Sequence, residues 1–190
     1  HYWFVKAERK AALMVKTMTN KTPLEIERKW MVNGFPDLPL LFSQQMRQGY
    51  IATHPTVRIR EEKMIYSSKD QPLKNEFILC FKSSGLLTRK EIEMEIPEEK
   101  FEELEDLIGL PLINKLRNTY LLKDGHHLEV SHVDEGLPSE FYYAEIEFKS
   151  EEEANAFDPK HVDLSDYLND DVTSQPNQSM AAYWQQTRQK

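Results

Sequence analysis

The sequence has a single cysteine and no long hydrophobic run, and each shortage excludes a class of protein. Cys80 is the one cysteine among 190 residues, which excludes an internal disulfide framework and predicts a reducing, cytoplasmic compartment. No apolar run approaches the ~18 residues of a membrane-spanning helix, and no signal-peptide pattern is visible. We therefore expect no membrane partner.

Basic residues are also in short supply relative to acidic ones. The chain has 24 Lys and Arg against 32 Asp and Glu, for a formal net charge of -8. Nonspecific nucleic-acid binding needs a basic footprint, so a nucleic-acid partner is not expected. A small anionic ligand stays compatible with this charge if the basic side chains are concentrated in one cavity.

The length and the composition predict one globular domain over residues 21–190. The hydrophobic content of 39% and the charged content of 29% suit a single domain with its own core. Residues 1–20 fit this pattern poorly, and either Met14 or Met18 could be the natural start. We expect them to be an N-terminal extension, with an amphipathic helix over residues 1–17, or a segment introduced for expression.

Period-two alternation of apolar and polar residues dominates the chain and predicts eight strands, mostly antiparallel. The predicted strands cover 24–32, 46–53, 56–63, 75–83, 88–96, 114–122, 126–133 and 141–148. A short helical turn is expected at 40–45, and helices are expected at 98–108, 151–157 and 177–188.

Charged side chains line one face of most predicted strands, and their sign is sorted by strand. Glu25, Glu27 and Lys29 share one face of the first strand, because side chains at i, i+2 and i+4 of a strand point the same way. Basic residues cluster on 56–63, 75–83 and 114–122, and carboxylates cluster on 24–32, 88–96 and 141–148. The opposite faces are apolar and need cover, which the helices can supply.

Two interpretations fit this alternation. An open antiparallel sheet with one wet face normally carries mixed charge. A closed barrel would instead turn the charged faces inward, and the sorting by sign favours it, since a solvated face usually intersperses signs to form cross-strand pairs. Buried charges must be paired or must bind something. A polyphosphate would satisfy the basic side chains, and Mg²⁺ or Mn²⁺ would satisfy the paired carboxylates.

A set of short charged motifs recurs in order along the chain. The first is Glu25-Ile26-Glu27-Arg28-Lys29, which has the form ExExK. It is followed in order by Arg47-Gln48-Gly49-Tyr50, Val57-Arg58-Ile59-Arg60, Phe81-Lys82-Ser83, Leu87-Thr88-Arg89-Lys90-Glu91-Ile92-Glu93, Lys115-Leu116-Arg117 and Ala144-Glu145-Ile146-Glu147-Phe148. This ordered set resembles the CYTH, or triphosphate tunnel metalloenzyme, superfamily, whose signature is ExExK, and its bacterial inorganic-triphosphatase branch in particular.

This resemblance implies an α+β fold, an eight-stranded antiparallel barrel with a charged interior and flanking helices. The implied activity is metal-dependent hydrolysis of inorganic triphosphate, or of another compound with a terminal triphosphate. A class IV-type adenylate cyclase and a thiamine triphosphatase are the alternatives within the family. A noncatalytic polyphosphate- or nucleotide-binding module is the alternative of another class, and the resemblance also makes a homodimer an expectation.

The resemblance carries roles to particular residues. The implied metal ligands are Glu25, Glu27, Glu145 and Glu147. The implied phosphate clamp is Arg58, Arg60, Lys82, Arg89, Lys115 and Arg117. The implied catalytic residues are Lys29, Tyr50, Glu91 and Glu93, where either a carboxylate or the lysine–tyrosine pair could orient or deprotonate the attacking water.

Two segments depart from the family pattern. The seventh strand reads Glu129-Val130-Ser131 where the family has an aspartate at the last position, and the nearby Asp134 is out of register. The C-terminal stretch 174–177 carries no lysine or arginine where the family often has a base. Both departures bear on catalytic competence and on substrate preference.

Overall fold

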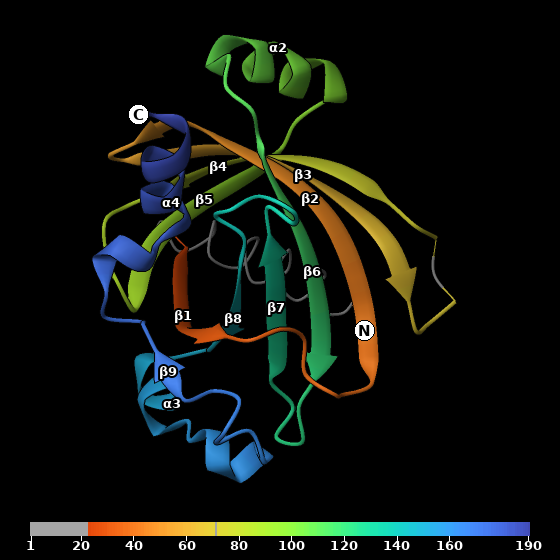
Figure 1. Ribbon diagram of the computed structural model, residues 1–190, viewed down its shortest axis with the longest axis vertical. Coiled ribbons are helices and arrows are strands. Elements are labelled where there is room, and N and C mark those ends of the chain that lie inside the picture. The colour runs from red at the N-terminus through yellow and green to blue at the C-terminus, as the bar shows by residue number, and fades with distance from the viewer. Residues whose placement is uncertain (1–22, 71) are drawn as a thin grey trace.

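Eight antiparallel strands close into a barrel in the computed structural model, which describes residues 23–70 and 72–190 (Figure 1). The strands are β1 (Leu24–Val32), β2 (Leu40–Thr53), β3 (Thr56–Ser67), β4 (Asn75–Lys82), β5 (Thr88–Glu95), β6 (Ile113–Leu121), β7 (His127–Val133) and β8 (Phe141–Glu147). The predicted helix at 1–17 lies outside the described residues.

Pairing between the first and fifth strands closes the barrel. The hydrogen-bonded order is β5-β4-β3-β2-β6-β7-β8-β1, and β1 also pairs with β5 through Glu25 opposite Arg89. A two-residue strand, β9 (Asp170–Asp171), adds to β1 beside Trp30 and Met31. Closure confirms the barrel interpretation, since an open sheet would leave β1 and β5 unpaired.

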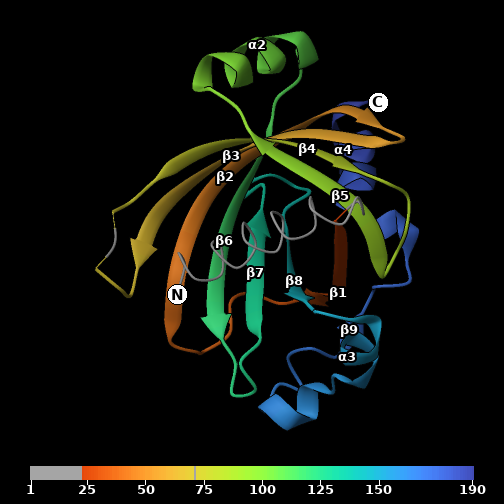
Figure 2. The ribbon, with the colours of Figure 1, turned by 180° about the vertical axis from the view of Figure 1, so that it is seen from behind.

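Two apolar clusters cover the outer faces of the strands. One cluster contains Trp30, Val130 and Ile146 and packs under α3 (Glu151–Ala156) and the 3₁₀ helix η1 (Pro159–Val162). The other contains Ile59 and Ile113 and packs under α2 (Glu98–Ile108) and α4 (Met180–Arg188). Figures 1 and 2 show α2 and α3 at opposite ends of the barrel. With helices outside, the charged faces are free to point inward.

Residues at the ends of the helices determine where each helix begins and ends. Pro97 precedes α2, whose first turn carries two glutamates, and Gly109 ends the helix with a left-handed φ of 64°. The Ser150 side chain caps α3 by accepting a hydrogen bond from the backbone N–H of Glu153. Of the helices in the described part, none is long and apolar enough to span a membrane.

The prediction of a helical turn at 40–45 is wrong, because β2 already begins at Leu40. Two irregularities interrupt the pairing of β2 in this stretch, one against β6 between Leu40 and Phe42 and one against β3 between Ser43 and Gln44. A β-bulge adds a residue and breaks the alternation of faces, so the sequence signal is lost there. The predicted helix at 177–188 divides into the 3₁₀ helix η2 (Pro176–Gln178) and α4.

Candidate active site

The barrel encloses a cavity of about 740 Å³ that is lined by charged side chains. Every side chain that the sequence predicted for the site lies on its wall. They are Glu25, Glu27, Lys29, Tyr50, Arg58, Arg60, Lys82, Arg89, Glu91, Glu93, Lys115, Arg117, Glu145 and Glu147. The inward face of each strand therefore contributes to one site.

Strands β1 and β8 form an acidic wall. Their register places Glu27 opposite Glu147 and Lys29 opposite Glu145. Burial, together with the neighbouring charges of Glu25 and Glu145, raises the pKa of Glu27 to about 8. Such crowded carboxylate oxygens are the ligand set that hard divalent cations prefer, and a bound cation would relieve their repulsion.

Glu25 stays ionised because two bases contact it. Lys82 Nζ donates to both carboxylate oxygens at 2.9 Å, and Arg89 donates to Oε2 at 3.0 Å. Burial alone would raise the pKa of Glu25, but Lys82 and Arg89 outweigh it and hold the pKa well below its usual range. Arg89 also reaches Glu27 at 2.5 Å and so links both carboxylates to β5.

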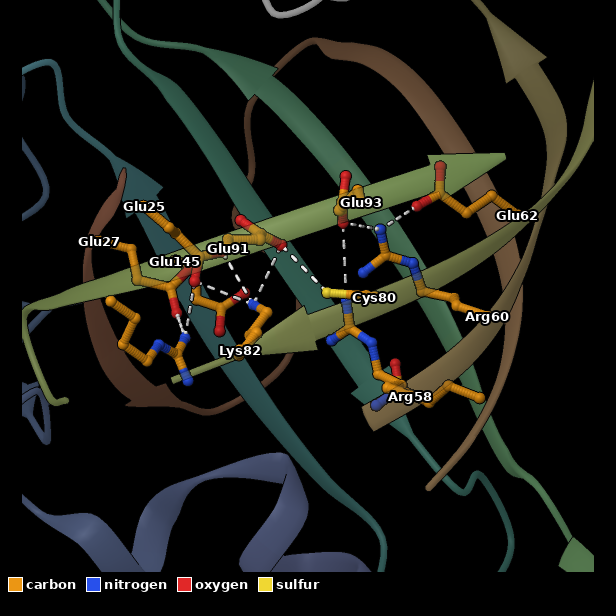
Figure 3. A network of polar contacts seen from close by, with 12 residues as sticks. Glu25, Glu27, Arg58, Arg60, Glu62, Cys80, Lys82, Glu91, Glu93 and Glu145 are labelled. Atoms are coloured by element: carbon orange, nitrogen blue, oxygen red, sulfur yellow. Dashed lines mark hydrogen bonds and ion pairs between the residues drawn. The ribbon is translucent and has the colours of Figure 1, made fainter. Parts of the chain in front are cut away.

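Strand β5 contributes a second acidic wall, shown in Figure 3 with its neighbours. Burial and the charges of Glu25 and Glu93 raise the pKa of Glu91 to about 7, although Lys82 lies 3.5 Å away. Partial burial acts on Glu93 as well, but the charges of Arg60 and Arg58 outweigh it and lower the pKa of Glu93. The two glutamates thus differ in protonation near neutral pH.

Cys80 faces these glutamates from β4. Its thiol donates to Glu91 Oε1 at 3.4 Å, and burial raises the pKa of the thiol to about 11. A protonated, buried thiol is a poor nucleophile.

The basic walls come from β3 and β6. Arg58, Arg60 and Arg117 each expose less than a tenth of their surface. In the described part of the chain, Arg58 Nε and Nη2, Arg60 Nε and Arg117 Nε are buried without a hydrogen-bond partner. Buried guanidinium donors without a hydrogen-bond partner are suited to a ligand rich in oxygen acceptors, and phosphate is such a ligand.

Carboxylates offset the basic walls only in part. Arg117 contacts Glu129 at 2.9 Å and Glu145 at 3.7 Å. Lys115 Nζ instead donates to Tyr143 Oη at 2.8 Å, and burial moves the pKa of Lys115 well below its usual value. The basic walls therefore retain N–H donors that could bind the oxygens of a polyanion.

Lys29 and Tyr50 both line the cavity, but each has its own partner. Lys29 Nζ donates to the backbone oxygen of Gln178 at 2.7 Å and lies 4.1 Å from the centre of the Tyr143 ring. Tyr50 Oη accepts a hydrogen bond from Gln48 at 3.1 Å. The structure thus gives Lys29 a contact with the C-terminal segment that the sequence did not reveal.

Sequence reasoning missed several residues of the wall. Glu129 and Tyr143 line the cavity, and so do parts of the C-terminal segment. The alternation contained a signal for Tyr143, because it precedes Glu145 by two residues and so shares its face of the strand. The structure pairs Glu129 with Thr119 across β6 and β7. Within the C-terminal part of the wall, the family pattern had pointed only to the stretch 174–177. No pattern indicated its other residues, namely Val172, Thr173, Gln178, Ser179, Met180, Ala181, Ala182 and Gln185.

The two departures from the family pattern have clear places in the structure. Ser131 is fully buried, in register between Arg117 on β6 and Tyr143 on β8. Asp134 does not replace the missing aspartate, because it binds Tyr183 and Arg188 of α4 instead. The cavity wall formed by residues 172–182 and Gln185 carries no charged side chain.

The fold and the cavity define a class of protein, the closed β-barrel with a charged interior cavity. The chain is 35% identical over 139 residues to the inorganic triphosphatase of Nitrosomonas europaea, covering 71% of this chain and 83% of that protein. The crystal structure of an inorganic triphosphatase superposes with a TM-score of 0.54 at 28% identity, covering 84% of this chain and 93% of that one. No protein-family model matches. The chain belongs to the CYTH, or triphosphate tunnel metalloenzyme, family.

Proposed function

We propose that this protein hydrolyses inorganic triphosphate, or another compound with a terminal triphosphate, in the barrel cavity with the help of a divalent metal ion. The observation that carries the proposal is the buried guanidinium nitrogens of Arg58, Arg60 and Arg117 that have no hydrogen-bond partner and face two acidic walls across one cavity. The relation to the Nitrosomonas europaea inorganic triphosphatase supports the same reaction.

The acidic wall of β1 and β8 fits Mg²⁺ or Mn²⁺. Glu25, Glu27, Glu145 and Glu147 offer oxygen ligands from adjacent strands, and the raised pKa of Glu27 reflects repulsion that a cation would remove. When bound, the cation neutralises phosphate charge and polarises the reacting phosphoryl group.

The chain's own residues would position the substrate. Phosphoryl transfer needs alignment and charge neutralisation more than covalent help. Arg58, Arg60, Lys82, Arg89, Lys115 and Arg117 would bind the phosphate oxygens from several strands at once. A chain of phosphates held on several sides would present its end to the second acidic wall.

Glu91 is the stronger candidate for the base that orients or deprotonates the attacking water. Its pKa of about 7 lies near the operating pH, where a general base works best. Glu93 stays ionised and pairs with Arg60 at 3.5 Å, which suits an orienting role. The Lys29–Tyr50 pair is the alternative, and Lys29 is placed near the acidic wall of β1 and β8.

Phosphate release from a panel of substrates tests the proposal. Triphosphate, pyrophosphate, ATP and thiamine triphosphate would each be assayed with Mg²⁺, with Mn²⁺ and with a chelator. We expect rapid, metal-dependent release from triphosphate and slow release from ATP. The Glu27→Gln variant should lose most of the metal-dependent rate, and an unchanged rate would overturn its role as a metal ligand.

Other outcomes would select the alternatives. Fast release from thiamine triphosphate alone would indicate a thiamine triphosphatase, and cyclic nucleotide formation from ATP would indicate a cyclase. Tight triphosphate binding without turnover would indicate a noncatalytic module, which Ser131 and the uncharged C-terminal wall make worth testing. A cytoplasmic location and a homodimer stay predictions.

A further inference from the structure

Asp134 lies outside the cavity, directly after β7, and takes three hydrogen bonds from the C-terminal helix. Arg188 donates to its two carboxylate oxygens at 2.6 and 3.0 Å, and Tyr183 Oη donates at 2.6 Å. Asp134 is 2% exposed and has a left-handed φ of 51°. A buried bidentate pair of this kind fixes orientation as well as distance.

Arg188 connects the helix to a third segment of the barrel. Its Nε donates to the backbone oxygen of Pro111 at 3.2 Å, and Nη2 donates to that of Leu112 at 3.3 Å. The same guanidinium therefore joins α4, the end of β7 and the connection between α2 and β6. Losing the carboxylate would leave a buried arginine with a charge that is no longer balanced.

The residues just before α4 hold Lys29 from the other side. The Gln178 carbonyl accepts from Lys29 Nζ at 2.7 Å, and Thr173 Oγ1 accepts from the backbone N–H of Lys29 at 3.0 Å. Gln178 and the first turn of α4 also line the cavity. The position of α4 thus determines both a cavity wall and the acceptor of the Lys29 ammonium.

We propose that Asp134 is a positioning residue for the reaction: by holding Arg188 and Tyr183 it fixes α4, and through Gln178 it fixes the Lys29 ammonium in the cavity. This inference rests on the proposed triphosphatase function. The arginines proposed to bind phosphate stand on β3, β5 and β6 rather than on α4, so Asp134 acts on turnover and leaves substrate affinity intact.

The test is the Asp134→Asn variant, since asparagine accepts a left-handed φ and has nearly the same size, while the charge and one of the two acceptor oxygens are lost. Asp163→Asn is a matched control: Asp163 has a φ of 58° and pairs with Lys123, but its side chain is 71% exposed. We expect kcat of Asp134→Asn to fall about tenfold to a hundredfold, as a displacement near 1 Å can cause. The affinity for a non-hydrolysable imido analogue of triphosphate should change less than about twofold, and the control should match the wild type on both measures.

A second experiment distinguishes a role of Asp134 in positioning Lys29 from a general loss of structure in the variant. In a Lys29→Ala background, Asp134→Asn should lower kcat by less than about twofold, because the group it positions is already gone. An additional tenfold loss there, or an unchanged kcat in the single variant, would overturn the proposal. A wild type without triphosphate turnover would overturn the proposed function first, and so the two failures are distinguishable.

Discussion

As a proposed metal ligand, Glu27 should link the protonation state of the site to cation binding. In the metal-free protein its pKa is raised to about 8, so near pH 6.5 it is mostly protonated. A cation must displace that proton, and apparent affinity should rise with pH by up to about tenfold per unit until the pH exceeds the pKa. Mn²⁺ titrations followed by electron paramagnetic resonance between pH 6 and 8.5 would measure this slope.

The Glu27→Gln variant should bind Mn²⁺ more weakly and with a flatter pH dependence over the same range. Glu91→Gln is the control, because the pKa of Glu91 is also raised but its carboxylate lies on the other acidic wall. It should keep the slope of the wild type. A wild-type affinity that does not vary with pH would contradict the assignment of Glu27.

Arg58 should be sensitive to replacement by lysine, although the charge is kept. Its side chain is buried, Nε and Nη2 have no hydrogen-bond partner, and a lysine cannot reproduce a planar, bidentate donor. We expect KM for triphosphate to rise about tenfold, which corresponds to one strong charge-assisted hydrogen bond. Arg47→Lys is the control, since Arg47 pairs with Glu61 and Glu105 and does not line the cavity. Equal effects of the two changes on KM would contradict the prediction.

The inward side chains could be predicted because a strand alternates strictly between two faces. That rule alone placed Arg58 and Arg60 on one wall and Glu91 and Glu93 on another. Pairings such as Lys82 with Glu25 could not be predicted, because they depend on closure between strands far apart in the chain. The contact of Lys29 with Gln178 joins residues 149 positions apart, and a backbone acceptor leaves no trace in residue type.

At the scale of the elements, Gly49 on β2 allows α2 and α4 to pack closely on the barrel. A Cβ at this position would lie 2.4 Å from Leu112 Cδ2 and 3.3 Å from Ile108 Cδ1. Because Leu112 is itself buried, Gly49→Ala should destabilise the fold by about 1–3 kcal/mol through overpacking. Chemical denaturation would measure the change.

A double-mutant cycle checks the cause of that loss. Leu112→Ala removes the clashing methyl group and should cost stability alone, but Gly49→Ala should add little to it. Full additivity of the two changes would show that the loss at Gly49 arises elsewhere, for example in the backbone of β2.

Strand β2 also marks the limit of prediction from pattern. Its second half was predicted, because the alternation that points Gln48 and Tyr50 inward is kept up to the register shift between Tyr50 and Ala52. Its first half was not, because Ser43 and Gln44 are both buried on either side of a register shift. Periodicity identifies regular strands, whereas a bulge is fixed by the neighbouring strands, which a local pattern does not contain.

For the molecule as a whole, the charge of the cavity differs from that of the rest of the protein. Seven lysine and arginine side chains and seven glutamates line the cavity, so they contribute no net charge at full ionisation. The formal charge of -8 therefore belongs to the rest of the chain. A divalent cation adds positive charge beside the basic walls, and a polyphosphate adds negative charge beside the acidic ones, so each should favour the binding of the other.

This coupling can be measured as a free energy between two ligands. We expect saturating Mg²⁺ to lower the Kd of the imido analogue of triphosphate at least about tenfold, a coupling of roughly 1.4 kcal/mol, and the analogue to strengthen Mg²⁺ binding by the same factor. Calorimetric titration of each ligand, with and without the other, gives both factors, after subtraction of the Mg²⁺ that the free analogue chelates. Glu27→Gln should reduce the coupling, because it removes a carboxylate of the wall assigned to the cation. Independent binding of the two ligands in the wild type would mean that the acidic wall and the basic walls do not form one site.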